Sequence, residues 1–403
     1  MTNEVVNVPE LRFTGFEDEW KETNLGNIAN IVGGGTPKTE IPEYWNGEIN
    51  WYSPVEIGDR NYVYESKNKI TQLGLQKSSA KILPIGTVLF TARAGIGNTA
   101  ILKKEGATNQ GFQSIIPKEG VLDTYFIFSR TNELKRYGEI HGAGSTFVEI
   151  SGKEMAKMPI SIPVIKEQQK IGDFFSKLDR QIELEEQKLS LLEEQKKGYM
   201  QKIFSKELRF KDEKGNDYPE WDITTIEKIA KVSKGFTPST KDINLWQNDN
   251  KNWLSIAGMS DKYIYEGNKG VSSAGEGKHK KVNEDTLIMS FKLTLGKLAI
   301  VKTPIYTNEA ICHFEWKTDQ IKTEYMYYYL SFINIESFGA QAVKGITLNN
   351  DSINSIVIKL PEFLEQNKIS NFFTKFDELM EKQNQKIDGL KKRKKGFLQK
   401  MFV

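Results

Sequence analysis

The sequence predicts two tandem α/β (α+β) globular domains joined by two long helices, which pair as an antiparallel coiled coil and give a dumbbell with approximate twofold symmetry. Three observations lead to this prediction. The sequence contains an internal repeat that occurs twice along the chain. Short β-rich runs lie between turn signals in the first part of each repeat, and a heptad pattern fills the second part. The predicted segments are globular, helical, globular and helical in turn: residues 1–163, 164–206, 207–361 and 362–403.

Composition limits the class of protein. The 403 residues are enough for two or three domains with cores of their own, and a hydrophobic fraction of 38% excludes wholesale disorder. The net charge of +3 barely favours nucleic acid, so a case for DNA binding depends on where the charges lie.

The cysteine and histidine content argues against a disulfide framework and a metal site. Cys312 is the only cysteine, and the three histidines, His141, His279 and His313, have no ligand-like spacing. We interpret the histidines as structural or surface residues. The sequence has neither the pattern of a signal peptide nor an apolar run of about 18 residues. It therefore predicts a cytoplasmic protein with no membrane partner.

The internal repeat is the strongest signal in the sequence. The pattern W-x-x-T-x-(L/I)-x-x-I-A, followed by a glycine-containing loop that ends in Thr-Pro, occurs twice. The offset is 201 at its tryptophan (221 − 20), 199 at a central threonine (286 − 87) and 198 near the end (372 − 174). The series also pairs Trp45 with Trp246 and Trp51 with Trp253. Such drift is what small insertions in surface loops produce in a duplicated domain.

The ends of the two repeats continue into each other. Residues 10–13 (ELRF) at the N-terminus match residues 207–210 (ELRF), which follow the first predicted helix and its Phe204. Phe402 at the C-terminus matches Phe204. The chain is therefore close to a cyclic permutation of itself, and we expect its two ends to meet in space.

The first part of each repeat contains short β-rich runs. Residues 87–90 (TVLF) and 286–289 (TLIM) are matched examples, and Gly, Asn and Pro turn signals separate such runs. This pattern favours an α/β fold for the globular parts.

The second part of each repeat is a heptad pattern over roughly 40 residues, more than three times the usual helix length. In each repeat the a and d positions of the heptads form an apolar row, here called the seam. Polar residues interrupt both seams in the same two places, Glu185 with Gln383 and Lys196 with Lys394, and we expect these polar residues to fix the register of the helix pair. Two amphipathic helices packed on their own domains are the alternative. The predicted helix-pairing seam consists of Phe175, Leu178, Ile182, Leu189, Leu192, Tyr199, Phe373, Phe376, Met380, Ile387, Leu390 and Phe397.

Connectivity sets the direction of the pair. The second globular part begins where the first helix ends, so paired helices run antiparallel and leave one globular domain at each end. Helices of this length span on the order of 60 Å at about 1.5 Å per residue. That exceeds one turn of B-DNA, about 34–36 Å. Such an arrangement would present two reading heads to separate segments of one duplex.

Motifs for catalysis are missing from the sequence. Asp217-Tyr218-Pro219 lacks the second proline of the Asn/Asp-Pro-Pro-aromatic loop that adenine methyltransferases need. No strand-to-helix turn has the G-x-G-x-x-G spacing, and the glycine-rich residues 270–278 lack the spacing and the Ser/Thr of a phosphate-binding P-loop. The sequence therefore predicts a protein that is not an enzyme.

Loops in each globular part carry groups that suit nucleic acid. Hydroxyls, lysines and backbone amides of the Thr-Pro loops can meet phosphate, and a cationic side chain in the loops at 91–97 and 290–296 can approach a groove. Gln110 suits adenine where its counterpart Glu309 suits cytosine. A tight turn, a structural salt bridge and a turn-capping difference are the respective alternatives. The DNA-binding candidates are Thr36, Lys38, Arg93, Asn109, Gln110, Ser145, Thr146, Lys234, Thr237, Ser239, Lys292, Asn308, Glu309, Lys344 and Thr347.

This ordered, duplicated layout resembles the specificity subunit of type I restriction-modification systems over nearly the whole chain. The carriers of the resemblance are Leu11-Arg12-Phe13 with Trp20, Thr36-Pro37, Thr237-Pro238, Pro163 with residues 167–171, Pro361 with residues 365–369, and the endings at 196–204 and 394–402.

The resemblance implies that the globular parts are target recognition domains, each reading one half of a bipartite site in double-stranded DNA. It implies that the helices set the gap between the half-sites and dock the partners, which are two methylation subunits and two restriction subunits. It also implies that this chain binds no cofactor, because S-adenosylmethionine, ATP and Mg²⁺ belong to the partner subunits.

Two other functions stay open on the sequence alone. The first is a self-sufficient DNA-modifying enzyme, which methyl transfer by the chain alone would support. The second is a coiled-coil scaffold whose heads bind other proteins, which a lack of sequence-specific DNA binding would support.

Overall fold

The computed structural model describes residues 7–403 apart from 94, 145–147, 248, 293 and 343–344, and it describes residues 340–342 and 345–347 by their backbone alone. Two compact units divide the chain. Unit 1 is Met1–Glu186 with Gln385–Val403, and unit 2 is Gln187–Asn384. Each unit therefore contains one globular part of the repeat and a share of both long helices.

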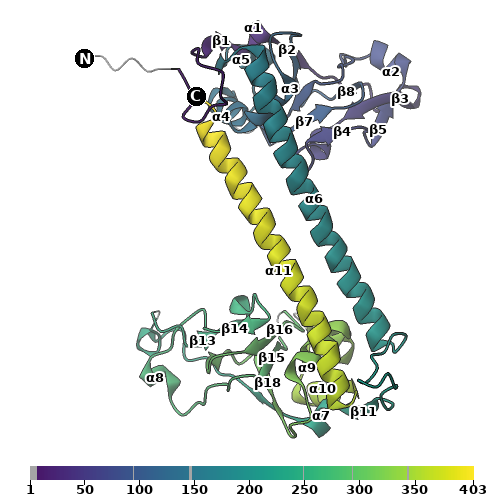
Figure 1. Cartoon of the computed structure of the whole chain (residues 1–403), viewed down its shortest axis with the longest axis vertical. Coiled ribbons are helices and arrows are strands. Elements are labelled where there is room, and N and C mark those ends of the chain that lie inside the picture. The colour runs from purple at the N-terminus through teal and green to yellow at the C-terminus, as the bar shows by residue number, and fades with distance from the viewer. Residues whose placement is uncertain (1–6, 94, 145–147, 248, 293, 343–344) are drawn as a thin grey trace. The chain divides into compact units, whose positions relative to one another are not determined.

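The two heptad runs form the long helices α6 (Ile165–Phe204) and α11 (Phe363–Lys400), which Figure 1 shows as continuous ribbons. The start of each helix is fixed by a glutamine. The side-chain amides of Gln168 and Gln366 donate to the carbonyl oxygens of Pro163 and Pro361, both at 2.9 Å. These bonds hold residues at the first turn, where backbone groups lack partners within the helix.

The helices pair antiparallel within unit 1. The rings of Phe174 and Phe397 lie 5.1 Å apart, and the carboxylate of Glu185 lies 2.5 Å from the ammonium of Lys386. Residue numbers rise along α6 while those of the contacting residues fall along α11. The partners therefore run in opposite directions.

The pairing in unit 2 follows the same rule. Lys196 lies 2.6 Å from Asp377, and the ring of Tyr199 lies 5.2 Å from that of Phe372. These contacts confirm the predicted antiparallel pairing of the two helices.

Most residues of the predicted seam are shielded from solvent. All of them are buried or half-buried except Tyr199, which is 37% exposed. Two of the polar breaks are ion-paired lysines, because Lys196 and Lys394 each contact a carboxylate of the opposite helix.

A mixed sheet forms the centre of unit 1. Its strand order is β2-β9-β6-β7-β4, with antiparallel neighbours except for the parallel pair β4 and β7. The bounds are β2 (Ala29–Gly33), β4 (Tyr62–Val63), β6 (Val88–Phe90), β7 (Thr99–Leu102) and β9 (Gln113–Pro117). The central strand β6 is buried along its whole length, which explains its unbroken apolar sequence.

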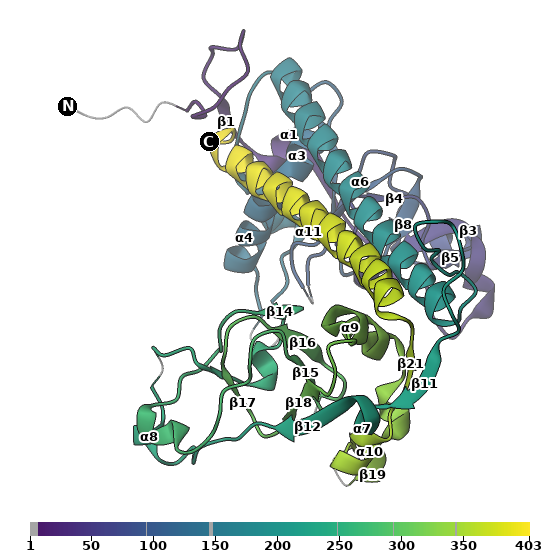
Figure 2. The same ribbon diagram turned by 60° about the horizontal axis from the view of Figure 1, so that its bottom comes forward.

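Unit 2 repeats this topology as β12-β18-β15-β16-β14, again with one parallel pair at the β14 edge, and Figure 2 shows these strands in one sheet. The bounds are β12 (Ala230–Lys234), β14 (Tyr263–Ile264), β15 (Leu287–Ser290), β16 (Leu298–Val301) and β18 (Ile311–Trp316). The match of strand order confirms the α/β duplication that the sequence predicts.

Smaller strand groups complete each globular part. In unit 1 these are β1 (Lys21–Asn24) with β10 (Pro159–Ile162), and β3 (Trp45–Tyr52) between β5 (Asn68–Ile70) and β8 (Gly106–Thr108). In unit 2 they are β11 (Asp222–Thr225) with β21 (Val357–Leu360), β13 (Trp253–Leu254) with β17 (Tyr306–Thr307), and β19 (Ala340–Ala342) with β20 (Gly345–Thr347).

Short helices connect the strands. Those of unit 1 are α1 (Leu25–Ile28), α2 (Gln72–Gln76), α3 (Thr124–Ser129), α4 (Thr131–His141) and α5 (Gly152–Ala156). Those of unit 2 are α7 (Ile226–Ile229), α8 (Ser273–Glu276), α9 (Thr323–Phe332) and α10 (Asn350–Asn354). The 3-10 turns are η1 (Pro42–Tyr44), η2 (Pro54–Glu56), η3 (Ile243–Leu245), η4 (Ile256–Gly258) and η5 (Ile335–Phe338). Thr71 and Ser272 cap α2 and α8 at matching positions of the repeat.

The chain ends meet in unit 1, as the sequence predicts. The amide of Leu11 donates to the carbonyl oxygen of Lys400 at 2.7 Å. In unit 2 the equivalent bond, from Leu208 to Lys202 at 3.0 Å, joins residues only 208 − 202 = 6 positions apart along the chain. The ELRF motif therefore has the same position in both units, against the end of the other repeat's helix.

A buried ion pair explains why the ELRF motif and the start of each long helix recur together. Arg12 donates two hydrogen bonds to Glu167, both at 2.8 Å, and this carboxylate is fully buried. Arg209 makes the same pair with the fully buried Glu365. The bond to Glu167 is the main reason that the pKa of Arg12 is raised. The pair ties the segment before each globular part to the long helix after it.

Candidate nucleic-acid interface

Each Thr-Pro loop is supported by a pair of tryptophans. In unit 1 the indoles of Trp45 and Trp51 meet edge to face at 5.1 Å. Their N–H groups donate to the carbonyl oxygens of Lys38, at 3.1 Å, and Gly35, at 2.8 Å. Both ends of the loop are therefore bonded to one rigid aromatic pair.

Unit 2 builds its Thr-Pro loop in the same way. Trp246 and Trp253 meet at 5.1 Å, and their indoles donate to Ser239, at 3.1 Å, and Phe236, at 2.9 Å. Sequence reasoning matched these tryptophans within the repeat but missed their role as loop supports. Their recurrence beside a recurring loop was the available signal.

A second loop meets the Thr-Pro loop in unit 1. The amide of Gly35 donates to the carbonyl oxygen of Thr108 at 2.8 Å, and the hydroxyl of Thr36 donates to the side-chain oxygen of Gln110. A Cβ on Gly34 would lie 2.0 Å from the carbonyl oxygen of Asn109, so only glycine permits this approach. The structure thus brings together Thr36, Asn109 and Gln110.

The corresponding loops of unit 2 meet with a different side-chain bond. Phe236 donates its amide to Thr307 at 2.8 Å, and the side-chain amide of Asn308 donates to the hydroxyl of Thr237 at 2.8 Å. Glu309, the counterpart of Gln110, is exposed. The side-chain oxygen of Asn308 accepts from the amide of Ala310, as Asn109 does from Gly111, both at 2.8 Å. The asparagines therefore cap the turn in both units.

A third loop, which follows β6 in unit 1, contacts the loop that contains Asn109 and Gln110. Ala92 donates its amide to Gly111 at 2.7 Å, and Ile150 donates to Ala92 at 3.1 Å. The side chain of Arg93 is 36% exposed, and its guanidinium lies 3.8 Å from the carboxylate of Glu149. An ion pair this long and exposed holds a side chain weakly. Arg93 is therefore available to an approaching ligand.

The loop after β15 is attached in the same way in unit 2. Phe291 donates to Ala310 at 3.0 Å, and Leu348 donates to Phe291 at 3.2 Å. Lys292, the counterpart of Arg93, is exposed, with its ammonium 5.5 Å from the ring of Phe291. Three loops of each unit thus converge on one scaffold with different side chains.

The remaining candidates lie on or near these loops. Lys38, Lys234 and Ser239 are exposed on the Thr-Pro loops. Ser145, Thr146 and Lys344 lie outside the described residues, and Thr347 is described by its backbone in β20. Within the described part of the chain, no group of three or more His, Cys, Asp and Glu side chains is placed to hold a metal ion. Every described helix is too short or too polar to span a bilayer.

A buried histidine underlies the loops of unit 2. The two ring nitrogens of His313 bond to the hydroxyls of Ser233, at 3.2 Å, and Thr307, at 2.5 Å. Burial lowers the pKa of His313 to about 4, so the ring is neutral near pH 7. Unit 1 has Ser114 at this position, whose buried hydroxyl has no partner among the described residues.

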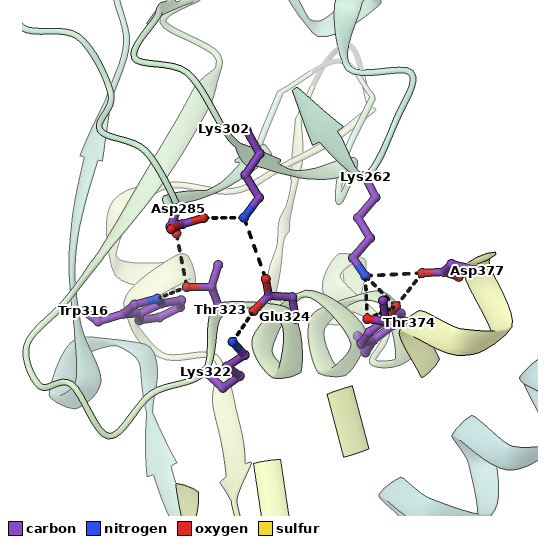
Figure 3. Close-up of polar contacts among 10 residues, drawn as sticks. Lys262, Asp285, Lys302, Trp316, Lys322, Thr323, Glu324, Thr374 and Asp377 are labelled. Atoms are coloured by element: carbon purple, nitrogen blue, oxygen red, sulfur yellow. Dashed lines mark hydrogen bonds and ion pairs between the residues drawn. The ribbon is translucent and has the colours of Figure 1, made fainter. Parts of the chain in front are cut away.

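A polar junction links the globular part of unit 2 to its helix pair (Figure 3). The ammonium of Lys262 lies 3.4 Å from the carboxylate of Asp377 and 3.2 Å from the hydroxyl of Thr374. Asp377 also accepts from the hydroxyl of Tyr328 and from Lys196. Desolvation lowers the pKa of Lys262, and the carboxylate of Asp377 opposes this shift.

Unit 1 has a junction of the same design with one charge fewer. Asp179 accepts from the hydroxyl of Tyr125 at 2.7 Å and pairs with Lys394 at 2.5 Å. Asn61 takes the place of Lys262 and donates to Tyr125 at 3.1 Å. Each globular part is therefore fastened to both long helices through one aspartate.

Comparison with known proteins points to one family. The family model described as "Type I restriction modification DNA specificity domain" matches the chain twice, over residues 17–194 and 218–392. The two matches together cover most of the chain and correspond to the two repeats.

Individual relatives agree with the family match. The chain is 33% identical over 251 residues to the MjaIX specificity subunit of a type I restriction enzyme from Methanocaldococcus jannaschii, covering 57% of this chain and 58% of that protein. It is 33% identical over 177 residues to the EcoR124I/EcoR124II specificity subunit of Escherichia coli, covering 42% and 43%. The chain thus spans about half the length of these two relatives.

A solved structure shares the fold. The S subunit of a type I restriction-modification system from M. genitalium matches with a TM-score of 0.62 over 98% of this chain and 99% of that one, at 13% sequence identity. The similarity extends over both repeats and both long helices.

Proposed function

The chain belongs to the type I restriction modification DNA specificity family, and from this membership we propose that it is the sequence-reading subunit of a type I restriction-modification complex and catalyses no reaction itself. One observation carries the proposal. In each unit three loops converge on the same scaffold, and their exposed side chains differ between the units. A matched scaffold with different side chains is what two reading heads for different half-sites require.

The chemistry of these loops suits base reading. Arginine can bond guanine through two hydrogen bonds, glutamine suits adenine, and glutamate accepts from the amino group of cytosine. Unit 1 offers Arg93 and Gln110, and unit 2 offers Lys292 and Glu309. The hydroxyls, backbone amides and lysines of the Thr-Pro loops then contact phosphate and fix the register.

The long helices have the second role in this proposal. They set the gap between the half-sites and dock two methylation subunits, and two restriction subunits join the complex. S-adenosylmethionine, ATP and Mg²⁺ bind to those partners. Deletion of one heptad from both helices should therefore shorten the tolerated gap between the half-sites.

The test is methylation mapping after co-expression with the methylation subunit. We expect a single split motif in the host DNA. Glu309→Gln should change the half read by unit 2, and Gln110→Glu the half read by unit 1. Glu284→Gln removes an exposed carboxylate of unit 2 from outside the three loops and should leave the motif unchanged. A folded complex that methylates no split motif would contradict the proposal and favour a protein scaffold.

A further inference from the structure

The turn that follows α2 in unit 1 and α8 in unit 2 differs in length between the two units. Gly74 and Gly275 mark its start in the same way, because a Cβ on either would lie within 2.4 Å of a backbone oxygen. Leu83 and Val282 mark its end, where their amides make equivalent bonds at 2.8 and 2.7 Å. The interval is 83 − 74 = 9 residues in unit 1 and 282 − 275 = 7 in unit 2. The turn of unit 2 is therefore two residues shorter.

The shorter turn is the more basic one. Residues 277–281 (GKHKK), here named the basic turn, replace residues 76–82 (QKSSAKI) of unit 1. Lys278, Lys280 and Lys281 are all exposed, and no carboxylate of a described residue lies within ion-pairing distance of them. Gly277 has φ +52°, which favours glycine and allows the turn to reverse within few residues. Three cationic groups are thus presented to solvent without a carboxylate partner among the described residues.

Aromatic contacts fasten the basic turn to the Thr-Pro loop. The imidazole of His279 stacks on the ring of Phe236 at 3.7 Å, with the planes 3° apart. Phe236 also meets Tyr306 edge to face at 5.4 Å, and the ammonium of Lys281 lies 5.5 Å from the Tyr306 ring. The same Phe236 accepts a hydrogen bond from Trp253. The lysines are therefore held beside the loop that the tryptophan pair supports.

Unit 1 has no room for this arrangement. Gly35 and Ala107 take the places of Phe236 and Tyr306, and a Cβ on Gly35 would lie 2.3 Å from the hydroxyl of Ser79. The turn of unit 1 therefore packs directly on its Thr-Pro loop. It carries two exposed lysines, Lys77 and Lys81, in place of three, and it has no stacked ring.

We propose that the basic turn is a clamp for the DNA phosphate backbone beside the half-site that unit 2 reads, and that unit 1 lacks it. This inference rests on the proposed DNA-reading function. Phosphate contacts position a protein on the duplex and make its affinity depend on salt. The His279 stack pre-orders the lysines, so less conformational freedom is lost on binding. In this proposal the basic turn adds phosphate contacts beside the half-site that unit 2 reads.

The test measures the Kd of the complex with methylation subunits for a duplex carrying the mapped motif, at a series of salt concentrations. The triple variant Lys278→Gln, Lys280→Gln, Lys281→Gln should reduce the slope of log Kd against log salt by about 1 to 3, because each phosphate contact contributes about 0.9. The control variant Lys211→Gln, Lys214→Gln, Lys228→Gln removes the same charge from unit 2 before β12. It should leave the slope unchanged.

His279→Ala separates the stack from the charges. This variant keeps all three lysines, so the slope should stay as in the wild type while the affinity falls about two- to tenfold through loss of the stack. The same change in slope in the control variant, or none in the triple variant, would overturn the clamp. If the wild-type complex still methylates its split motif in that case, the reading function stands. A wild-type complex without a split motif would instead overturn the proposed function itself.

Discussion

The ammonium of Lys394 lies 2.5 Å from the carboxylate of Asp179, although the two residues come from different repeats. Lys196 and Asp377 make the equivalent contact at 2.6 Å. In both units a tyrosine hydroxyl from the globular part donates to the same carboxylate. One aspartate per unit therefore joins both helices and the recognition domain. Each long helix supplies the aspartate of one unit and the lysine of the other.

Asp377→Asn should destabilise unit 2. The substitution leaves Lys196 and Lys262 facing a neutral amide, and removal of one member of a fully buried pair costs about 3–5 kcal/mol. Asp377 is 28% exposed, so we expect a smaller loss of about 2 kcal/mol in the free energy of unfolding. Urea unfolding measures the loss. Asp388→Asn, at an exposed position of α11, should stay within about 0.5 kcal/mol of the wild type. Equal stabilities of the two variants would contradict the role of Asp377 in stabilising the junction.

Periodicity and connectivity were sufficient to predict the backbone architecture. The heptad steps predicted α6 and α11, and the duplicated order predicted that the ELRF motif meets the end of the other helix. The interaction partners of single polar residues were not predictable in this way. Glu167 has the sequence position of a helix surface charge, yet it is fully buried against Arg12. The heptad pattern predicts that Lys196 is a polar break in the seam, whereas its ammonium bonds a carboxylate outside the seam pattern.

The candidate site was predicted only as a set of loops. Their recurrence was visible, but which loops meet depends on strand order. Thr36 and Gln110 bond across 74 positions of sequence, and no local pattern gives such a separation. The exchange of Gly35 for Phe236 was readable in the sequence. The structural consequence of this exchange could not be predicted, because the ring that covers Phe236 belongs to His279, which lies in a turn of different length.

Trp246→Phe should weaken DNA binding at one half-site only. The variant keeps an aromatic ring against Trp253 but loses the hydrogen bond to Ser239, worth about 1 kcal/mol or roughly fivefold in affinity. Trp45→Phe is the matched change for the other half-site, where the lost bond is to Lys38. Binding to duplexes altered in one half-site or the other measures each effect. An equal loss at both half-sites from either variant would contradict loop-specific support.

Cys312 should report the opening of unit 2. Burial raises the pKa of its thiol to about 12, and the thiol donates to the carbonyl oxygen of Met289 at 3.3 Å. The reactive thiolate is therefore nearly absent at pH 8, and a disulfide reagent should label the folded chain only as fast as unit 2 opens. Asp377→Asn should speed this labelling and Asp179→Asn should not. A cysteine placed at the exposed Lys214 (Lys214→Cys) gives the unprotected rate. Labelling of Cys312 at that rate would rule out its burial.

His313 should make the stability of unit 2 depend on pH in the acid range. Its pKa is about 4 in the folded chain, against an ordinary value near 6.5. Below pH 6.5 the unfolded chain binds a proton that the folded chain does not. The contribution of the neutral ring is therefore complete above pH 6.5 and is lost as the pH falls towards 4, by about 3 kcal/mol in all.

The comparison with His313→Gln isolates this effect, because carboxylates titrate in both proteins alike. Glutamine keeps a donor and an acceptor for Ser233 and Thr307 but takes up no proton in this range. Urea unfolding at a series of pH values should give a wild-type free energy that falls more steeply than that of the variant between pH 6.5 and 4. The two curves should run parallel above pH 6.5, where the ring is neutral in both the folded and the unfolded chain. Parallel curves throughout the acid range would mean that the histidine takes up its proton in the folded protein, and the buried network would then not hold it neutral.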